Sequence, residues 1–188
     1  MNLATAYWES AALSAAIETG VFAAISSGCE TMEEIAASAG TAPRHTGELL
    51  DALAAMGLLK KRAGRYTWAK GISEFLSRSG SQCILDALKF NADLYPLWGR
   101  LGECIRKGQS VIPASAHLGA DAEKTRRFVS GMHSRALAFA PQVLSALHLN
   151  GRRRLLDVAS GPGTFSSMLA EVHPGLNVTL FDLPPVLA

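Results

Sequence analysis

The first 80 residues place apolar side chains at helical spacing and then change to a short alternating pattern. Helices are predicted over three segments, which are 3–19, 31–39 and 43–56. The buried stripe of the third segment consists of Leu49, Leu50, Leu53 and Met56. Residues 58–60 and 65–68 flank a turn at Ala63 and Gly64, and this pattern predicts a hairpin. Three helices followed by a hairpin indicate a winged helix over residues 1–80.

Capping and breaking residues mark the ends of these helices. Thr31 is followed three positions later by Glu34, which is the spacing of a capping box at a helix start. Gly20 and Gly40 act as stops, and Gly57 closes the third helix. The N-terminal segment is therefore predicted to be mainly α-helical.

Residues 81–149 are predicted to be a helical connector. The segments 72–78 and 81–107 have helical composition, with interruptions at Pro96 and Gly99. Residues 108–120 are rich in Gly, Ser, Ala and Pro, which is typical of a loop. A long helix is predicted from Ala122 to Leu149, with a kink at Pro141. One face of this helix carries Phe128, Met132, Ala136 and Phe139.

The last 39 residues, 150–188, contain a strand, a glycine turn, a helix and a second strand. Strands are predicted at about 153–159 and 177–182, and the second strand ends in Asp182. This order is the layout of a nucleotide-binding βαβ half-unit, in which an acid accepts hydrogen bonds from ribose hydroxyls. The glycines allow a ligand to approach the backbone closely.

The glycine turn does not fit the dinucleotide pattern G-x-G-x-x-G, because Ser166 stands where the third glycine would fall. It resembles instead the acid-x-G-x-G-x-G motif of S-adenosylmethionine-dependent methyltransferases. Asp157 is the acid, Gly161 and Gly163 are the last two glycines, and Ala159 replaces the first. If the backbone at Ala159 needs a positive φ, the alanine costs about 1 kcal/mol or more. The alternative is a tight turn that binds no ligand.

Composition adds few constraints on function. The net charge of +2 gives no argument for a nucleic-acid or membrane partner. No apolar run approaches the roughly 20 residues of a membrane span, and the start lacks the pattern of a signal peptide. The three cysteines are far apart and odd in number, which favours reduced thiols in a cytoplasmic protein. The five histidines lack metal-ligand spacing, so no metal site is predicted.

A winged helix also raises the question of DNA binding, in which the third helix would enter the major groove. The exposed face of that helix is expected to carry Glu48, Asp51, Ala52 and Ala55. Two acids would be repelled by phosphates, so a protein-protein role is favoured. The first helix has a small-residue face that suits packing across a dimer or, alternatively, within one subunit. This face consists of Ala11, Ala12, Ala15 and Ala16.

Taken together, the chain resembles the small-molecule O-methyltransferases that include caffeate-type, acetylserotonin and bacterial antibiotic methyltransferases. The resemblance covers essentially the whole chain, in which winged helix, helical connector and cofactor motif follow one another. The segments that carry it are Ala11 to Leu13, Gly20 to Phe22, Glu34 to Ala36, Leu49 to Leu53, Gly57 to Leu59, Phe128 to Met132, Asp157 to Gly163 and Phe181 to Pro184.

The resemblance implies a role for each of these parts. The N-terminal domain would form a homodimer, and S-adenosylmethionine would be the cofactor. Asp157, Gly161, Gly163, Asp182 and Met132 would form its site, with Asp182 on the ribose hydroxyls. Phe128, Met132 and Arg135 would line the pocket of a small aromatic or polyketide-like acceptor. From spacing alone, core packing is the preferred explanation of Phe128 and Met132. A salt bridge within the protein is expected for Arg135 in preference to a substrate carboxylate.

In this family the catalytic base is a histidine well beyond the ribose acid, so it is expected after Ala188. Two strands and one helix do not make a stable sheet. We therefore expect the chain to be a piece of a longer enzyme and inactive alone; a truncated gene or a partner chain are the alternatives.

A non-catalytic winged-helix regulator with a vestigial cofactor turn is the second hypothesis for function. The acceptor, and methylation of oxygen rather than carbon or nitrogen, cannot be read from the residues themselves.

Overall fold

The structure is a computed structural model that describes residues 2–80, 82–112 and 121–187. The chain divides into two compact units, Met1–Lys89 and Phe90–Ala188. The larger part of the predicted 108–120 loop lies outside the described residues. Each unit is described separately below.

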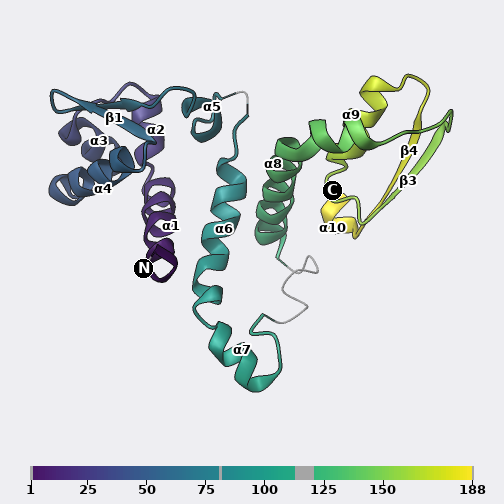
Figure 1. Cartoon of the computed structure of the whole chain (residues 1–188), viewed down its shortest axis with the longest axis horizontal. Helices are drawn as coiled ribbons and strands as arrows, with labels where there is room; N and C mark the ends of the chain where they lie inside the picture. Colours follow the sequence, from purple (N-terminus) through teal and green to yellow (C-terminus); the bar gives the residue numbers. More distant parts are fainter. Residues whose placement is uncertain (1, 81, 113–120, 188) are drawn as a thin grey trace. The chain divides into compact units, whose positions relative to one another are not determined.

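The first unit consists of helices and one hairpin (Figure 1). Its elements in chain order are α1 (Asn2–Glu18), α2 (Val21–Ser26), α3 (Met32–Ala39), α4 (Pro43–Ala55), β1 (Leu59–Arg62), β2 (Arg65–Trp68) and α5 (Ser73–Leu76). The predicted helices and hairpin are all present. The sequence prediction missed α2, because six residues between two glycines are too few to show a helical period.

The predicted capping box opens α3. The Thr31 hydroxyl accepts a hydrogen bond from the Glu34 backbone N–H, and the Glu34 carboxylate accepts from the Thr31 N–H in return. These bonds hold the pKa of Glu34 below its ordinary value of 4.5, with the Thr31 N–H as the largest cause. At the other end Gly40 adopts the left-handed conformation at φ 65°, which ends the helix as predicted.

The core of the first unit forms where α2, α3 and α4 meet the hairpin. Its largest fully buried side chains are Val21, Ile35, Leu50 and Leu53. The predicted stripe of α4 is therefore correct for Leu50 and Leu53. Leu49 is only half-buried against this core, and Met56 is a half-buried residue that follows α4, which ends at Ala55.

The hairpin packs with its inner face against α4. Strands β1 and β2 are antiparallel, with Leu59 paired to Trp68 and Arg62 to Arg65. Asp51 on α4 accepts hydrogen bonds from the Lys61 ammonium at 2.6 Å and the Tyr66 hydroxyl at 2.7 Å. These bonds tie the hairpin to the helix that precedes it.

The second unit contains the long helix and the parallel strands (Figure 1). Its elements are α6 (Leu85–Trp98, which begins in the first unit), α7 (Leu101–Lys107), α8 (Ala122–Ala146), β3 (Arg154–Val158), α9 (Thr164–Val172), β4 (Asn177–Phe181) and α10 (Pro184–Leu187). Gly99 separates α6 from α7 as predicted. Pro96 does not interrupt α6 but lies inside it, close to its end at Trp98.

Helix α8 ends three residues earlier than predicted, at Ala146 instead of Leu149. It opens at Asp121, whose carboxylate accepts hydrogen bonds from the backbone N–H groups of Glu123 and Lys124. Pro141 stays within the helix, and the axis of α8 bends in its second half (Figure 1).

Strands β3 and β4 pair in parallel, with Leu155 beside Val178 and Asp157 beside Leu180. Both lie where the sequence predicts them. Their outer face is apolar and open, because Leu156, Val158 and Phe181 are 61%, 63% and 64% exposed. No helix among the described residues is long and apolar enough to cross a membrane.

Candidate functional site

The turn between β3 and α9 places three residues in the left-handed region. Ala159, Gly161 and Gly163 have φ values of 58°, 57° and 70°. Ala159 occupies the position of the first glycine in the methyltransferase motif, and its backbone has the positive φ that favours glycine. The strain anticipated for Ala159 is present, at a cost of about 1 kcal/mol.

The two glycines of this turn serve different purposes. A Cβ on Gly163 would lie 2.6 Å from Cδ1 of Leu180, so this glycine lets α9 begin close against β4. A Cβ on Gly161 would meet no atom within 4 Å. Gly161 therefore faces open space, and a ligand can approach its backbone.

Asp182 follows the end of β4, and its carboxylate is hydrogen-bonded to the glycine turn. One carboxylate oxygen accepts a hydrogen bond from the Gly161 N–H at 2.7 Å, and the other accepts from the Leu183 N–H at 2.7 Å. A carboxylate oxygen has two lone pairs, so each oxygen can still accept a bond from a ligand hydroxyl. The two backbone bonds fix the direction in which those lone pairs point.

Asp157 has a different partner. Its carboxylate accepts a hydrogen bond of 2.5 Å from the Ser166 hydroxyl, and Ser166 is 2% exposed. This bond attaches the first turn of α9 to β3. Ser166 is a supporting residue that sequence reasoning missed, because the position was compared only with the glycine of another motif.

A cavity of about 570 Å³ lies between this turn and α8. The structure brings together in its wall the predicted residues Asp157, Gly161, Asp182, Met132 and Arg135, as well as Phe128. Gly163 is not part of the wall. The remaining lining residues are Ala136, Phe139, Ala159, Ser160, Pro162, Thr164, Phe165, Leu183 and Val186.

The aromatic face of α8 borders this cavity instead of filling a core. Phe128 and Met132 are half-buried, and Phe139 is 57% exposed. The buried positions of α8 are the small or polar residues Thr125, Gly131, Ser134 and Ala140. Core packing, the simpler interpretation of the spacing, does not describe this face.

Two hydrogen bonds hold α8 in place around the cavity. His133 Nδ1 and Thr164 Oγ1 are 2.8 Å apart, which connects α8 to the first residue of α9. Arg135 donates from Nη2 to the side-chain oxygen of Asn91 on α6 at 2.9 Å. Neither His133 nor Asn91 was predicted, since no local pattern reveals partners 31 and 44 positions apart in the chain.

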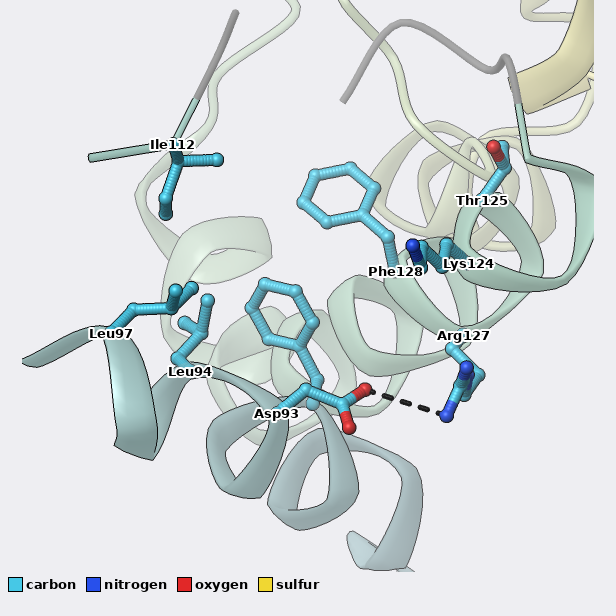
Figure 2. Close-up of a pocket in the computed structure, with 9 residues that line it drawn as sticks. Asp93, Leu94, Leu97, Ile112, Lys124, Thr125, Arg127 and Phe128 are labelled. Carbon is cyan, nitrogen blue, oxygen red and sulfur yellow. Dashed lines mark ion pairs between the residues drawn. The ribbon is translucent and has the colours of Figure 1, made fainter. Parts of the chain in front are cut away.

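A second cavity of about 320 Å³ lies between α6 and α8 (Figure 2). Phe128 lines both cavities and makes an edge-to-face contact with Phe90, with ring centroids 5.4 Å apart. Arg127 faces Asp93 across this cavity in an ion pair of 3.7 Å (Figure 2). The described residues contain no group of three or more His, Cys, Asp or Glu side chains that could hold a metal ion.

Two family models match the chain in succession. Residues 1–88 match the O-methyltransferase dimerisation domain, and residues 98–188 match the O-methyltransferase domain.

Curated relatives match over the whole chain. A 3-hydroxy-5-methyl-1-naphthoate 3-O-methyltransferase of Streptomyces sahachiroi is 31% identical, with 100% of this chain and 55% of the relative covered. Acetylserotonin O-methyltransferase of Mus musculus is 31% identical, covering 100% of this chain and 53% of the relative. The chain thus spans about half the length of the curated relatives it matches.

Among solved structures, human N-acetylserotonin methyltransferase in complex with S-adenosylmethionine superposes with a TM-score of 0.87. The match covers 99% of this chain and 59% of that one at 23% identity. It shows that the fold is an N-terminal helical domain followed by part of a methyltransferase domain, as the sequence predicts.

Proposed function

The chain belongs to the O-methyltransferase family, since it matches the dimerisation domain and the methyltransferase domain over about half the length of its relatives, and we propose that it acts in S-adenosylmethionine-dependent methylation of a small acceptor. The acceptor is a hydroxyl group on an aromatic or polyketide-like molecule. The observation that carries this proposal is the wall of the larger cavity. It combines the glycine turn and Asp182 on one side with the aromatic face of α8 on the other.

The residues of the turn fit the cofactor. Gly161 faces open space, and the lone pairs left on Asp182 suit the paired hydroxyls of a ribose. Asp157 supports the turn through Ser166, and Gly163 does so by its close approach to Leu180. When bound, S-adenosylmethionine would supply the methyl group on its sulfonium sulfur.

On the opposite wall, Met132 and Phe128 are the proposed contacts for the sulfonium end and the acceptor ring. Flat aromatic molecules bind well against side chains of this kind. Relatives with similar sequences are named for methylation of a hydroxynaphthoate and of acetylserotonin, which are both aromatic. Another relative is named as an N,N-dimethyltransferase, so transfer to oxygen is part of the proposal. We assign no catalytic base among the described residues.

Self-association is proposed for the first unit, as a winged helix that serves dimerisation. Helix α1 leaves Leu3, Tyr7 and Trp8 exposed by 93%, 54% and 61%, which is an apolar surface suited to a second copy. Ala16, by contrast, is buried in the unit's own core. On α4, Arg44 and His45 each pair with Glu48. Asp51 is bonded to the hairpin lysine Lys61, so the cations near this helix are matched by its acids.

The proposed domains follow one another along the chain. Residues 1–80 form the dimerisation domain, residues 81–149 form the connector with the acceptor-lining helix, and residues 150–188 form the first part of the cofactor domain. Nucleic acid and membrane are not proposed as partners, and a cytoplasmic location is proposed.

Binding of S-adenosylhomocysteine by the full-length protein, measured by calorimetry, tests this function. Asp182→Ala should abolish binding, because it removes the acceptor for the ribose hydroxyls and leaves the Gly161 N–H without its partner. Glu171→Ala, an exposed carboxylate on α9, is the matched control and should bind like the wild type. Unchanged binding by Asp182→Ala, or retention of DNA at moderate salt, would favour the non-catalytic regulator.

A further inference from the structure

Arg135 is the one cation among the described residues that line the larger cavity. It projects from α8 on the same face as Met132 and shares the cavity wall with Gly161 and Asp182. Arg135 is exposed, so its guanidinium either pairs with a protein carboxylate or stays solvated and accessible to a ligand. The hydrogen-bond partners of the surrounding acids distinguish these two cases.

The two acids of the cavity wall are engaged elsewhere. Asp157 accepts from the Ser166 hydroxyl, and Asp182 accepts from two backbone N–H groups. Among the residues that the structure describes, no carboxylate lies within ion-pair distance of Arg135. Its partner is the neutral amide of Asn91.

Arg127, two turns earlier on α8, shows the opposite arrangement. Its guanidinium pairs with Asp93 and with Glu123, each at 3.7 Å. The charge of Arg127 is therefore neutralised by carboxylates of the protein. Asn91 holds the guanidinium of Arg135 in place but does not neutralise its charge. An amide oxygen uses one N–H of the guanidinium and leaves most of its planar fork available.

We propose that Arg135 binds a carboxylate group that a ligand presents in this cavity. Two sources have this chemistry: a hydroxyaryl carboxylic acid as methyl acceptor, and the α-carboxylate of the cofactor. A planar carboxylate matches the guanidinium fork with two parallel hydrogen bonds. Phe128 and Phe139 line the same cavity and would contact the ring of an aromatic acid. The inference rests on the proposed function and assigns to it a specificity-determining residue.

Equilibrium binding by the full-length protein distinguishes the sources with four probes. The probes are S-adenosylhomocysteine, its analogue without the α-carboxylate, 3-hydroxy-1-naphthoate and the corresponding carboxamide. Arg135→Gln should weaken binding of the carboxylate-bearing ligand by roughly ten- to a hundredfold, the range for a charge-assisted hydrogen bond. The analogue without the carboxylate should bind wild type and variant alike. Arg126→Gln, the same charge change at an exposed position of α8 outside both cavity walls, should change nothing.

A loss confined to hydroxynaphthoate assigns Arg135 to the acceptor, and a loss confined to S-adenosylhomocysteine assigns it to the cofactor. Asn91→Asp gives an independent readout. It supplies an internal carboxylate to Arg135 and should lower affinity for the same acidic probe only, because protein and ligand then compete for one cation.

Two results would overturn this inference but leave the proposed function standing. One is normal binding of both acidic probes by Arg135→Gln, and the other is that Arg135→Gln weakens an acidic probe and its neutral analogue equally. The second would indicate that Arg135 only supports the structure. A wild-type protein that binds neither S-adenosylhomocysteine nor hydroxynaphthoate would overturn both this inference and the proposed function.

Discussion

The two units of this chain use apolar side chains for different purposes. In the first unit the stripe of α4 packs into the core, where Leu50 and Leu53 have no exposed surface. In the second unit the comparable stripe of α8 leaves Phe139 57% exposed and borders a cavity of about 570 Å³. Two helices with the same period in their sequences thus give a packed core in one unit and a binding wall in the other.

The buried residues of the second unit explain this difference. They are dominated by small and polar side chains such as Thr164 and Ser166, which fix the glycine turn through hydrogen bonds. Stability in the first unit should therefore depend on volume, and in the second on backbone geometry and polar contacts. Substitutions at matched positions test this contrast.

The largest effect is expected for Leu50→Ala in the first unit. Removing a fully buried leucine side chain should lower the free energy of unfolding by about 2–5 kcal/mol, since the cavity left behind cannot collapse completely. Leu156→Ala in β3, where the side chain is 61% exposed in the 188-residue chain, should cost that chain roughly 0.5 kcal/mol or less. Urea denaturation of both variants measures the difference. Equal losses would mean that the two units are packed alike.

Backbone geometry is the next test, through Gly163→Ala. The new Cβ would approach Leu180 and the backbone has a φ of 70°, so a loss of about 1–3 kcal/mol in unfolding free energy is expected. Gly161→Ala has the same backbone strain but open space, and should cost only about 1 kcal/mol. In the background of Leu180→Ala, the penalty of Gly163→Ala should shrink toward that of Gly161→Ala. A penalty that Leu180→Ala leaves unchanged would contradict the packing role of Gly163.

Much of the fold follows from local sequence signals. The capping box at Thr31, the hairpin around Gly64 and the strand that ends in Asp182 are each specified by residues close together in the chain. Helix α2 escaped prediction because it is one and a half turns long and is held by core contacts of Val21 and Phe22 rather than by its own period.

Less of the site could be predicted, because its contacts join distant segments. The motif located Gly161 and Asp182, but not the hydrogen bond between them across 21 positions. The neutral partner of Arg135, 44 positions away, could not be inferred from composition or spacing. Nor could the pattern of α8 tell a cavity wall from a core, since both need apolar residues at helical spacing.

A smaller effect is expected at two alanines that share a left-handed backbone. Ala63 in the hairpin turn has a φ of 49° and Ala159 in the cofactor turn has a φ of 58°. Replacement by glycine should raise the free energy of unfolding by up to about 1 kcal/mol at each position, because the Cβ strain is removed. Ala37→Gly, in the exposed interior of α3, is the control and should lower it by about 0.5–1 kcal/mol. Destabilisation by Ala159→Gly would show that strain at the turn is absent.

The smallest effects concern pH and the two helix caps, Glu34 in the first unit and Asp121 in the second. The pKa of each carboxyl lies below its ordinary value, chiefly because of the Thr31 N–H for Glu34 and the Lys124 N–H for Asp121. The folded protein therefore releases these protons more readily than the unfolded chain. The resulting stabilisation is complete above the ordinary values of 4.5 and 3.8 and is lost as the pH falls through the lowered ones.

Glu34→Gln and Asp121→Asn keep an oxygen that can accept the capping bonds but cannot titrate. Each should therefore flatten the decline of unfolding free energy between about pH 6 and about pH 3, measured by urea denaturation at several pH values. Both carboxyls are exposed, so each change should be small and of similar size in the two units. The two units would then differ in their buried side chains, but the carboxylates at their exposed helix N-termini would contribute similarly to stability. A steeper decline in either variant would contradict the sign of the pKa shift at that cap.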